Sequence, residues 1–165
     1  SSIRTVAAEA GISTGSLRHV FPSKADLLVH ATELVGRRAQ GRIEEHLYEP
    51  DPRALVLAVI KELLPLDAER RAEMEVNVAL IAEAPGDERV KEVLDVAHAT
   101  VRDACRHMIA HLHRAGLTAP DLDVEGATTL LHGLVDGLAI HMLVNPDPAF
   151  ERQALSMIET TINGL

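Results

Sequence analysis

Apolar residues in this chain recur every three or four positions, in segments separated by proline and glycine. The clearest segment spans residues 88–115, where Val90, Leu94, Ala97 and Val101 begin one continuous apolar stripe. A repeat of this period places the apolar side chains on one face of an α-helix. Each such helix must bury its stripe against a neighbour, so the pattern favours a set of packed helices.

The composition favours the same fold class. Apolar residues make up 47% of the chain, but aromatic residues make up only 2%. Strands favour aromatic and β-branched residues, whereas alanine, leucine and methionine are good helix formers. We find no convincing strand pattern and no internal repeat. The sequence therefore predicts an all-α fold.

Length, cysteine content and hydropathy limit the class of protein further. A chain of 165 residues suits one compact unit, or a small head fused to a larger body. A single cysteine allows no internal disulfide and favours a reducing compartment. The longest uncharged stretches, 126–135 and 137–146, are shorter than the roughly 20 apolar residues that span a bilayer. We therefore predict a cytoplasmic protein with no membrane partner.

Proline, glycine and N-cap residues mark the expected ends of the helices. Ser23, with Asp26 three residues later, is typical of a capping box at the start of a long helix. The turn at 49–52 is a candidate hinge between a head and a body. The predicted helices cover residues 2–10, 13–20, 24–47, 53–64, 67–84, 88–115, from Asp121 or Asp123 to 144, and 148–164.

Residues 6–20 carry the pattern that a helix-turn-helix requires. Apolar residues such as Val6 and Leu17 supply contacts between two short helices, Gly11 allows the turn, and Ser13 caps the second helix. An ordinary helical hairpin satisfies the same pattern. Residues 1–24 hold three basic side chains against one acidic, whereas residues 47–165 hold ten basic and twenty acidic ones. An acidic body repels phosphate, so nucleic acid contact is expected only at the N-terminal end.

The continuation of this segment resembles the DNA-binding domain of the tetracycline-repressor (TetR) family. About 26 residues are covered, and the matching ones are Val6-Ala7, Ala10-Gly11-Ile12-Ser13, Gly15, Leu17, His19, Phe21-Pro22-Ser23-Lys24 and Asp26-Leu27-Leu28. The acidic remainder is similar to the ligand-binding and dimerisation body of that family, in particular of its betaine-pathway repressors. The resemblance implies a DNA-binding head over 1–46, with one further helix before Ser1, and an effector-binding and dimerisation body over 47–165.

The resemblance also implies which residues contact double-stranded DNA. Thr5 lies near a helix N-terminus that suits a phosphate, and Thr14 is expected to open the recognition helix. The family usually has an aromatic residue where this chain has Arg18, which is able to bind the edge of a guanine or only a phosphate. The predicted DNA contacts are Arg4, Thr5, Thr14, Gly15, Ser16, Arg18, His19 and Lys24.

A family member would bind a palindromic operator as a homodimer, because one recognition helix makes too few contacts. Gly133 and Gly137 form a Gly-x-x-x-Gly step that lets two helices approach closely. The predicted interface comprises Leu130, Gly133, Leu134, Gly137, Leu138, Ala154, Met157, Ile158 and Thr161. The alternative is that these residues pack inside one subunit.

Family members also hold a small-molecule effector in the body. Polar residues that interrupt apolar faces are the candidates, because burial of a polar group requires a partner. They are Asn77, His98, Arg102 and Cys105, and Asp136 with His132 one turn before it interrupts another apolar segment. The alternative for each is a satisfied polar group of the core. Since aromatic residues are few, an aliphatic or polar ligand is expected rather than a flat cationic one.

The sequence predicts a transcriptional regulator, acting as a repressor, and not an enzyme. It indicates no catalytic residue, cofactor or metal site. Two alternatives remain open. The head could be degenerate, with Arg18 and Val20 as its departures from the family pattern, which would leave a ligand-binding helical dimer. A helical metalloenzyme could use His107 and His111, which share a helix face, although no Glu completes a His-Glu-x-x-His arrangement.

Overall fold

A computed structural model of the chain describes residues 20–165, and within this range it contains helices and connecting turns but no strand. The elements are α3 (Lys24–His46), α4 (Pro52–Glu62), α5 (Ala68–Glu83), a short 3₁₀ helix η1 (Ala84–Gly86), α6 (Glu88–Arg114), α7 (Val124–Val144) and α8 (Pro148–Asn163). The predicted all-α class is confirmed. From α3 onward the predicted boundaries hold to within the one or two residues by which helix ends are generally ambiguous.

The helix ends form where the sequence places capping residues. The Ser23 side chain accepts a hydrogen bond from the backbone N–H of Asp26 at 3.1 Å and begins α3. Asp123, rather than Asp121, begins α7 by accepting from the backbone N–H of Gly126. Gly116 ends α6 with a φ of 69°, and Leu117 N–H donates to the carbonyl of Leu112, which closes a Schellman motif.

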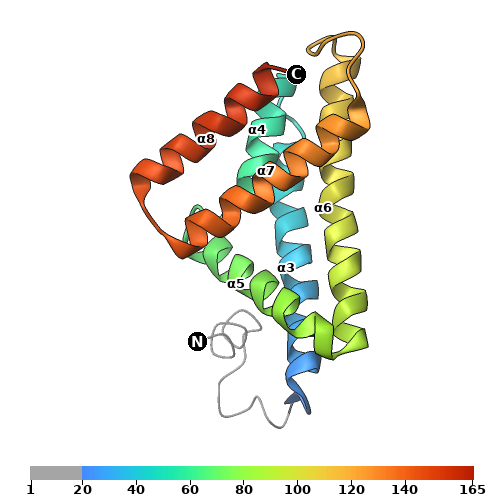
Figure 1. Cartoon of the computed structure of the whole chain (residues 1–165), viewed down its shortest axis with the longest axis vertical. Helices are drawn as coiled ribbons and strands as arrows, with labels where there is room; N and C mark the ends of the chain where they lie inside the picture. The colour runs from blue at the N-terminus through green and yellow to red at the C-terminus, as the bar shows by residue number, and fades with distance from the viewer. Residues whose placement is uncertain (1–19) are drawn as a thin grey trace.

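The long helices α3 and α6 run side by side along the length of the molecule (Figure 1). Helix α7 crosses α6, and the chain then reverses into α8 to form a helical hairpin at one edge. Helix α4 packs against α3, α6 and α8, and helix α5 packs against α3, α6 and α7.

The apolar side chains form two clusters. The larger cluster joins α4, α6, α7 and α8 and includes Ile60, Ile109, Leu131 and Ile158. The smaller cluster joins the start of α3 to α5 and α6. It comprises Leu27, Leu28, Ala31, Val76, Ala79, Leu80, Ala84 and Val90. Helix α3 contacts both clusters, because Ile43 near its end packs against the larger one.

Helix α7 is long and apolar enough to cross a membrane by length and composition alone. The sequence prediction missed this, because it counted uncharged stretches and stopped at Asp136. In the structure α7 packs against α6 and α8, and Leu131, Val135 and Ala139 are buried in the larger cluster. These contacts are those of a core helix in a helical bundle, which passes the same test.

Candidate DNA, effector and interface sites

Most of the predicted DNA contacts lie outside the described residues. These are Arg4, Thr5, Thr14, Gly15, Ser16, Arg18 and His19. Lys24 is the first residue of α3, and its ammonium group pairs with the carboxylate of Glu83 in α5. Both side chains are substantially exposed, so the pair costs little to break. A phosphate contact by Lys24 remains a prediction.

Three of the predicted effector contacts lie along the boundary between α6 and α7. The His98 and His132 rings have centroids 4.6 Å apart. The Arg102 guanidinium donates to the Thr129 hydroxyl at 3.1 Å and to Glu125 Oε2 at 3.0 Å. The boundary therefore carries a row of polar groups on both helices.

Cys105 lies on the same side of α6 and is fully buried. Burial, aided by the nearby negative charge of Asp136, raises the pKa of the Cys105 thiol to about 11. The thiol is therefore protonated at neutral pH and behaves as a small apolar side chain. Asn77 is separate from this row: it is half-buried in α5, where its amide lies 3.9 Å from the sulfur of Met74.

The α6–α7 boundary also brings together two histidines and a carboxylate. Nε2 of His132 lies 3.3 Å from Oδ2 of Asp136, one turn further along α7. One ligand atom each of His98, His132 and Asp136 lies within 4.8 Å of the other two. His132 is buried, whereas His98 and Asp136 are exposed. The interruption of an uncharged segment by Asp136 was the sequence signal for this cluster.

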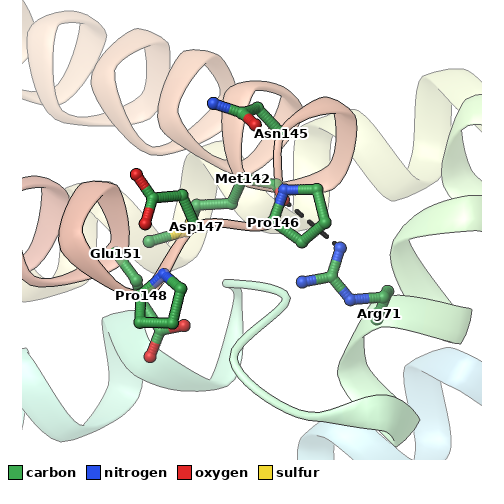
Figure 2. A pocket seen from close by; sticks show the side chains of 7 residues that line it. All are labelled: Arg71, Met142, Asn145, Pro146, Asp147, Pro148 and Glu151. Atoms are coloured by element: carbon green, nitrogen blue, oxygen red, sulfur yellow. Dashed lines mark hydrogen bonds between the residues drawn. The ribbon is translucent and has the colours of Figure 1, made fainter.

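Two cavities lie elsewhere in the body. Figure 2 shows the first, of about 170 Å³, where Arg71 of α5 faces the turn between α7 and α8. Nη1 of Arg71 donates to the carbonyl of Met142 at 3.2 Å. The second, of about 270 Å³, lies between α4 and α8 and is bordered by Leu57, Lys61 and Leu155. Neither is lined by Asn77, His98, Arg102 or Cys105. Sequence reasoning treated 145–148 only as a turn, and so missed the first cavity.

A charged network joins α3, α4 and α5. The Arg42 guanidinium donates to both carboxylate oxygens of Glu73, at 2.9 and 2.7 Å, and its Nε donates to Glu62 at 2.8 Å. Nε2 of His46 lies 3.0 Å from the other oxygen of Glu62. Glu73 is buried against the Arg42 guanidinium, and Glu62 lies 3.5 Å from Nη1 of Arg70 as well, so both carboxylates face a cation.

The network shifts the pKa values of its members. Burial opposes the charged form of Glu62, but hydrogen bonds from His46 and Arg42 outweigh burial and lower the pKa of Glu62. The hydrogen bonds to Glu73 raise the pKa of Arg42 further above its usual value. Both groups are therefore held in their charged forms at neutral pH.

The predicted interface residues separate into two groups. Leu130 is 57% exposed and Met157 is 45% exposed. Gly133 and Gly137 lie on the same outer face of α7, and a Cβ added at either would meet no atom within 4 Å. Ile140 and Val144 extend this apolar face, although the sequence analysis did not single them out.

The other predicted interface residues contact their own chain. Leu138, Ala154 and Ile158 are buried in the larger cluster, which favours the alternative that they pack inside one subunit. These residues belong to the apolar faces through which α7 and α8 pack against the rest of the subunit. Leu134 is half-buried against the same cluster, and the Thr161 hydroxyl donates to the carbonyl of Met157.

Models of known protein families match both the N-terminal and the C-terminal part of the chain. The sequence model for bacterial regulatory proteins of the tetR family matches residues 1–31, and that for the C-terminal part of BetI-type transcriptional repressors matches residues 52–165. The HTH-type transcriptional regulator PksA of Bacillus subtilis is 34% identical over 146 residues, which cover 88% of this chain and 70% of PksA.

Solved structures with the same fold are also transcriptional regulators. One from Rhodococcus is 28% identical with a TM-score of 0.71, over 94% of this chain and 81% of its own. One from Saccharomonospora viridis, solved in complex with choline, has a TM-score of 0.71 at 22% identity, over 95% of this chain and 80% of its own. At 22% identity, the Saccharomonospora viridis structure shows only that the two proteins share a fold.

The chain belongs to the TetR family of transcriptional regulators. The BetI-type match covers α4 to α8, and the tetR match covers the start of the chain into α3. The chain is therefore a DNA-binding regulator rather than an enzyme, and the expected all-α head and body organisation follows from the family.

Proposed function

We propose that this regulator is a cytoplasmic repressor that binds a near-palindromic operator as a homodimer and leaves it when a small molecule occupies its body. In this proposal residues 1–46 form the DNA-binding head and residues 47–165 the effector-binding and dimerisation body. The DNA contacts predicted from the sequence are retained, with Arg18 as a candidate for reading a base.

The observation that carries the proposal is the exposed apolar face of the α7–α8 hairpin. Leu130, Gly133, Gly137 and Ile140 recur along one side of α7, and Met157 lies exposed on α8. Spacing of three and four residues aligns the α7 positions into one face. Glycines on that face permit a second helix to approach closely. A face of this kind supports pairing of two copies about a two-fold axis.

Dimerisation is tested by placing a charge on this face. We expect Leu130→Glu to weaken the dimer by at least about 10-fold, because a buried, unpaired carboxylate costs several kcal/mol at an interface. The matched control is Leu47→Glu, at a leucine that is 59% exposed at the end of α3. Light scattering over a dilution series measures both. Equal dissociation of the two variants, or a monomeric parent chain, would rule out this interface.

Operator binding is tested with the full-length gene product and DNA that flanks its own gene. In an electrophoretic shift at two salt concentrations, we expect a complex that survives a scrambled competitor. Arg18→Ala should abolish the sequence preference while lowering the salt slope by no more than about one ion. If scrambled DNA competes equally well, the binding comes only from sequence-independent attraction to the phosphate backbone. That result would favour the alternative in which the head is degenerate.

We propose an aliphatic or polar effector of modest size that carries no quaternary ammonium group, although the Saccharomonospora viridis structure contains choline. Quaternary ammonium groups are commonly bound by aromatic cages. No aromatic residue lines either described cavity, and Tyr48 projects into solvent. Asn77, His98, Arg102 and Cys105 remain candidate contacts. Release of operator DNA by choline at micromolar concentration would overturn this choice of ligand class.

A further inference from the structure

The histidine–carboxylate cluster at the α6–α7 boundary has the composition of a metal site. Imidazole and carboxylate are the nitrogen and oxygen ligands that bind Zn²⁺, usually in tetrahedral geometry. We propose that His98, His132 and Asp136 bind one divalent transition-metal ion of the zinc type, independently of whether the chain binds an operator.

The spacing of the donor atoms fits this proposal. Ligands bonded to one Zn²⁺ at about 2.0–2.1 Å lie roughly 3.4 Å apart at tetrahedral angles. Nε2 of His132 and Oδ2 of Asp136 are 3.3 Å apart, which matches that separation. The third ligand atom, from His98, lies within 4.8 Å of both. His98 is exposed, so a rotation of its side chain can close the remaining distance.

The two ligands on α7 are held in place by the helix, whereas the exposed ligand on α6, His98, can change its side-chain orientation. His132 and Asp136 are four residues apart on α7, so the helix itself holds them on one face. His132 is also buried, which limits its ring to few orientations. Three protein ligands leave a fourth position for water or for a polar group of a small molecule.

The surrounding charge does not oppose a cation. Arg102, which follows His98 by one turn of α6, is paired with Glu125 at 3.0 Å. The chain as a whole carries a formal charge of −9 at neutral pH. Within residues 20–165, His98, His132 and Asp136 are the group of three or more such donors close enough to share an ion.

This site differs from the histidine pair that the sequence offered as its metal alternative. His107 and His111 share a face of α6, but they belong to no group of three donors among the described residues. The sequence analysis predicted no metal site at these residues, because the three ligands come from two helices, α6 and α7, and His98 lies far from the other two along the chain. Packing of α7 across α6 brings them together, so a bound ion would cross-link these two helices.

The test is metal titration of the full chain without a histidine tag, after removal of metals by a chelator. We expect one Zn²⁺ per chain in calorimetry and, with Co²⁺ as a probe, visible absorption bands of a low-coordinate site. His98→Ala and Asp136→Asn should each weaken Zn²⁺ binding at least about 100-fold, since even outer-shell changes cost 10–100-fold. Both positions are exposed, so these variants are expected to fold, and circular dichroism confirms it.

The matched control is the double variant His107→Ala with His111→Ala, which removes two histidines from the same helix. It should keep the affinity, stoichiometry and Co²⁺ spectrum of the parent chain. Absence of a tight site in the parent chain would overturn the proposal. So would loss of binding in the control while His98→Ala retains it.

Discussion

The molecule holds two polar clusters between helices, and they are built differently. In the α3–α4–α5 network the Arg42 guanidinium lies between the carboxylates of Glu62 and Glu73, with donors facing acceptors. In the α6–α7 cluster the ligand atoms of His98, His132 and Asp136 face one another. A neutral imidazole has one unprotonated ring nitrogen, so all three atoms are electron-pair donors when each imidazole carries its proton on the other nitrogen.

The difference indicates two kinds of role. The first cluster contains its own cation, so it is complete without a ligand and fixes how three helices pack. The second gathers groups that a cation would join, at a position that solvent reaches through His98 and Asp136. Removing a member of the first cluster should therefore cost stability directly, whereas removing a member of the second should matter only when an ion is present.

The largest expected effect is that of Arg42→Met. This change leaves the buried Glu73 carboxylate without its bidentate partner, and breaking a buried pair on one side costs about 3–5 kcal/mol. Since the Arg42 side chain retains 23% exposure, we expect the low end, about 3 kcal/mol. Denaturant unfolding measures the change, and Arg37→Met, at an exposed site of α3, should stay within about 0.5 kcal/mol of the parent.

A double variant shows where this cost arises. In Arg42→Met combined with Glu73→Leu, no unpaired carboxylate remains at position 73, and apolar groups replace the pair. We expect most of the lost free energy of unfolding to return. A double variant as unstable as Arg42→Met would show that the loss came from packing of the arginine stem or from the lost hydrogen bond to Glu62 rather than from the unpaired Glu73.

The next effect is a pH dependence carried by Glu62. Its pKa is lowered from an ordinary value of 4.5, so Glu62 stabilises the fold above about pH 4.5 and loses this contribution as the pH falls through the lowered value. Glu62→Gln should lower the free energy of unfolding by about 1–2 kcal/mol at neutral pH. The difference from the parent should shrink as the pH falls below 4.5 and through the lowered pKa of Glu62.

Urea unfolding at several pH values measures this effect. Glu92→Gln, at an exposed position of α6, serves as the control and should follow the parent curve at every pH. A constant difference between Glu62→Gln and the parent from neutral to acid pH would mean that the charge of Glu62 is not what stabilises the network.

The helices were largely predictable because their signals are local. Ser23 and Asp123 cap helices within three residues of themselves, and Gly116 ends α6 through its own backbone conformation. Apolar periodicity likewise identified the faces that become buried. It could not show which neighbour covers a face, and this is why Ala154 and Ile158 were expected at a dimer interface but lie in the core of their own chain.

The polar sites were less predictable because they depend on tertiary contacts. The unusual polarity of His98, His132 and Asp136 was visible, but their proximity depends on how α7 crosses α6. Arg42 and Glu73 looked like ordinary charged residues of two amphipathic helices, and nothing in their local sequence indicated a shared bidentate pair.

The smallest expected effect completes the comparison, and it is that of His98→Ala in metal-free protein. His98 is exposed and contributes only a ring contact with His132, so the free energy of unfolding should change by no more than about 0.5 kcal/mol. With free Zn²⁺ at about 100 times the dissociation constant, the parent should gain about 2.7 kcal/mol, and the variant should gain almost nothing. Urea unfolding with chelator and with buffered Zn²⁺ measures both conditions. If His98→Ala lost more than about 1 kcal/mol in chelator, the α6–α7 cluster would stabilise the fold by itself, as the Arg42 network does.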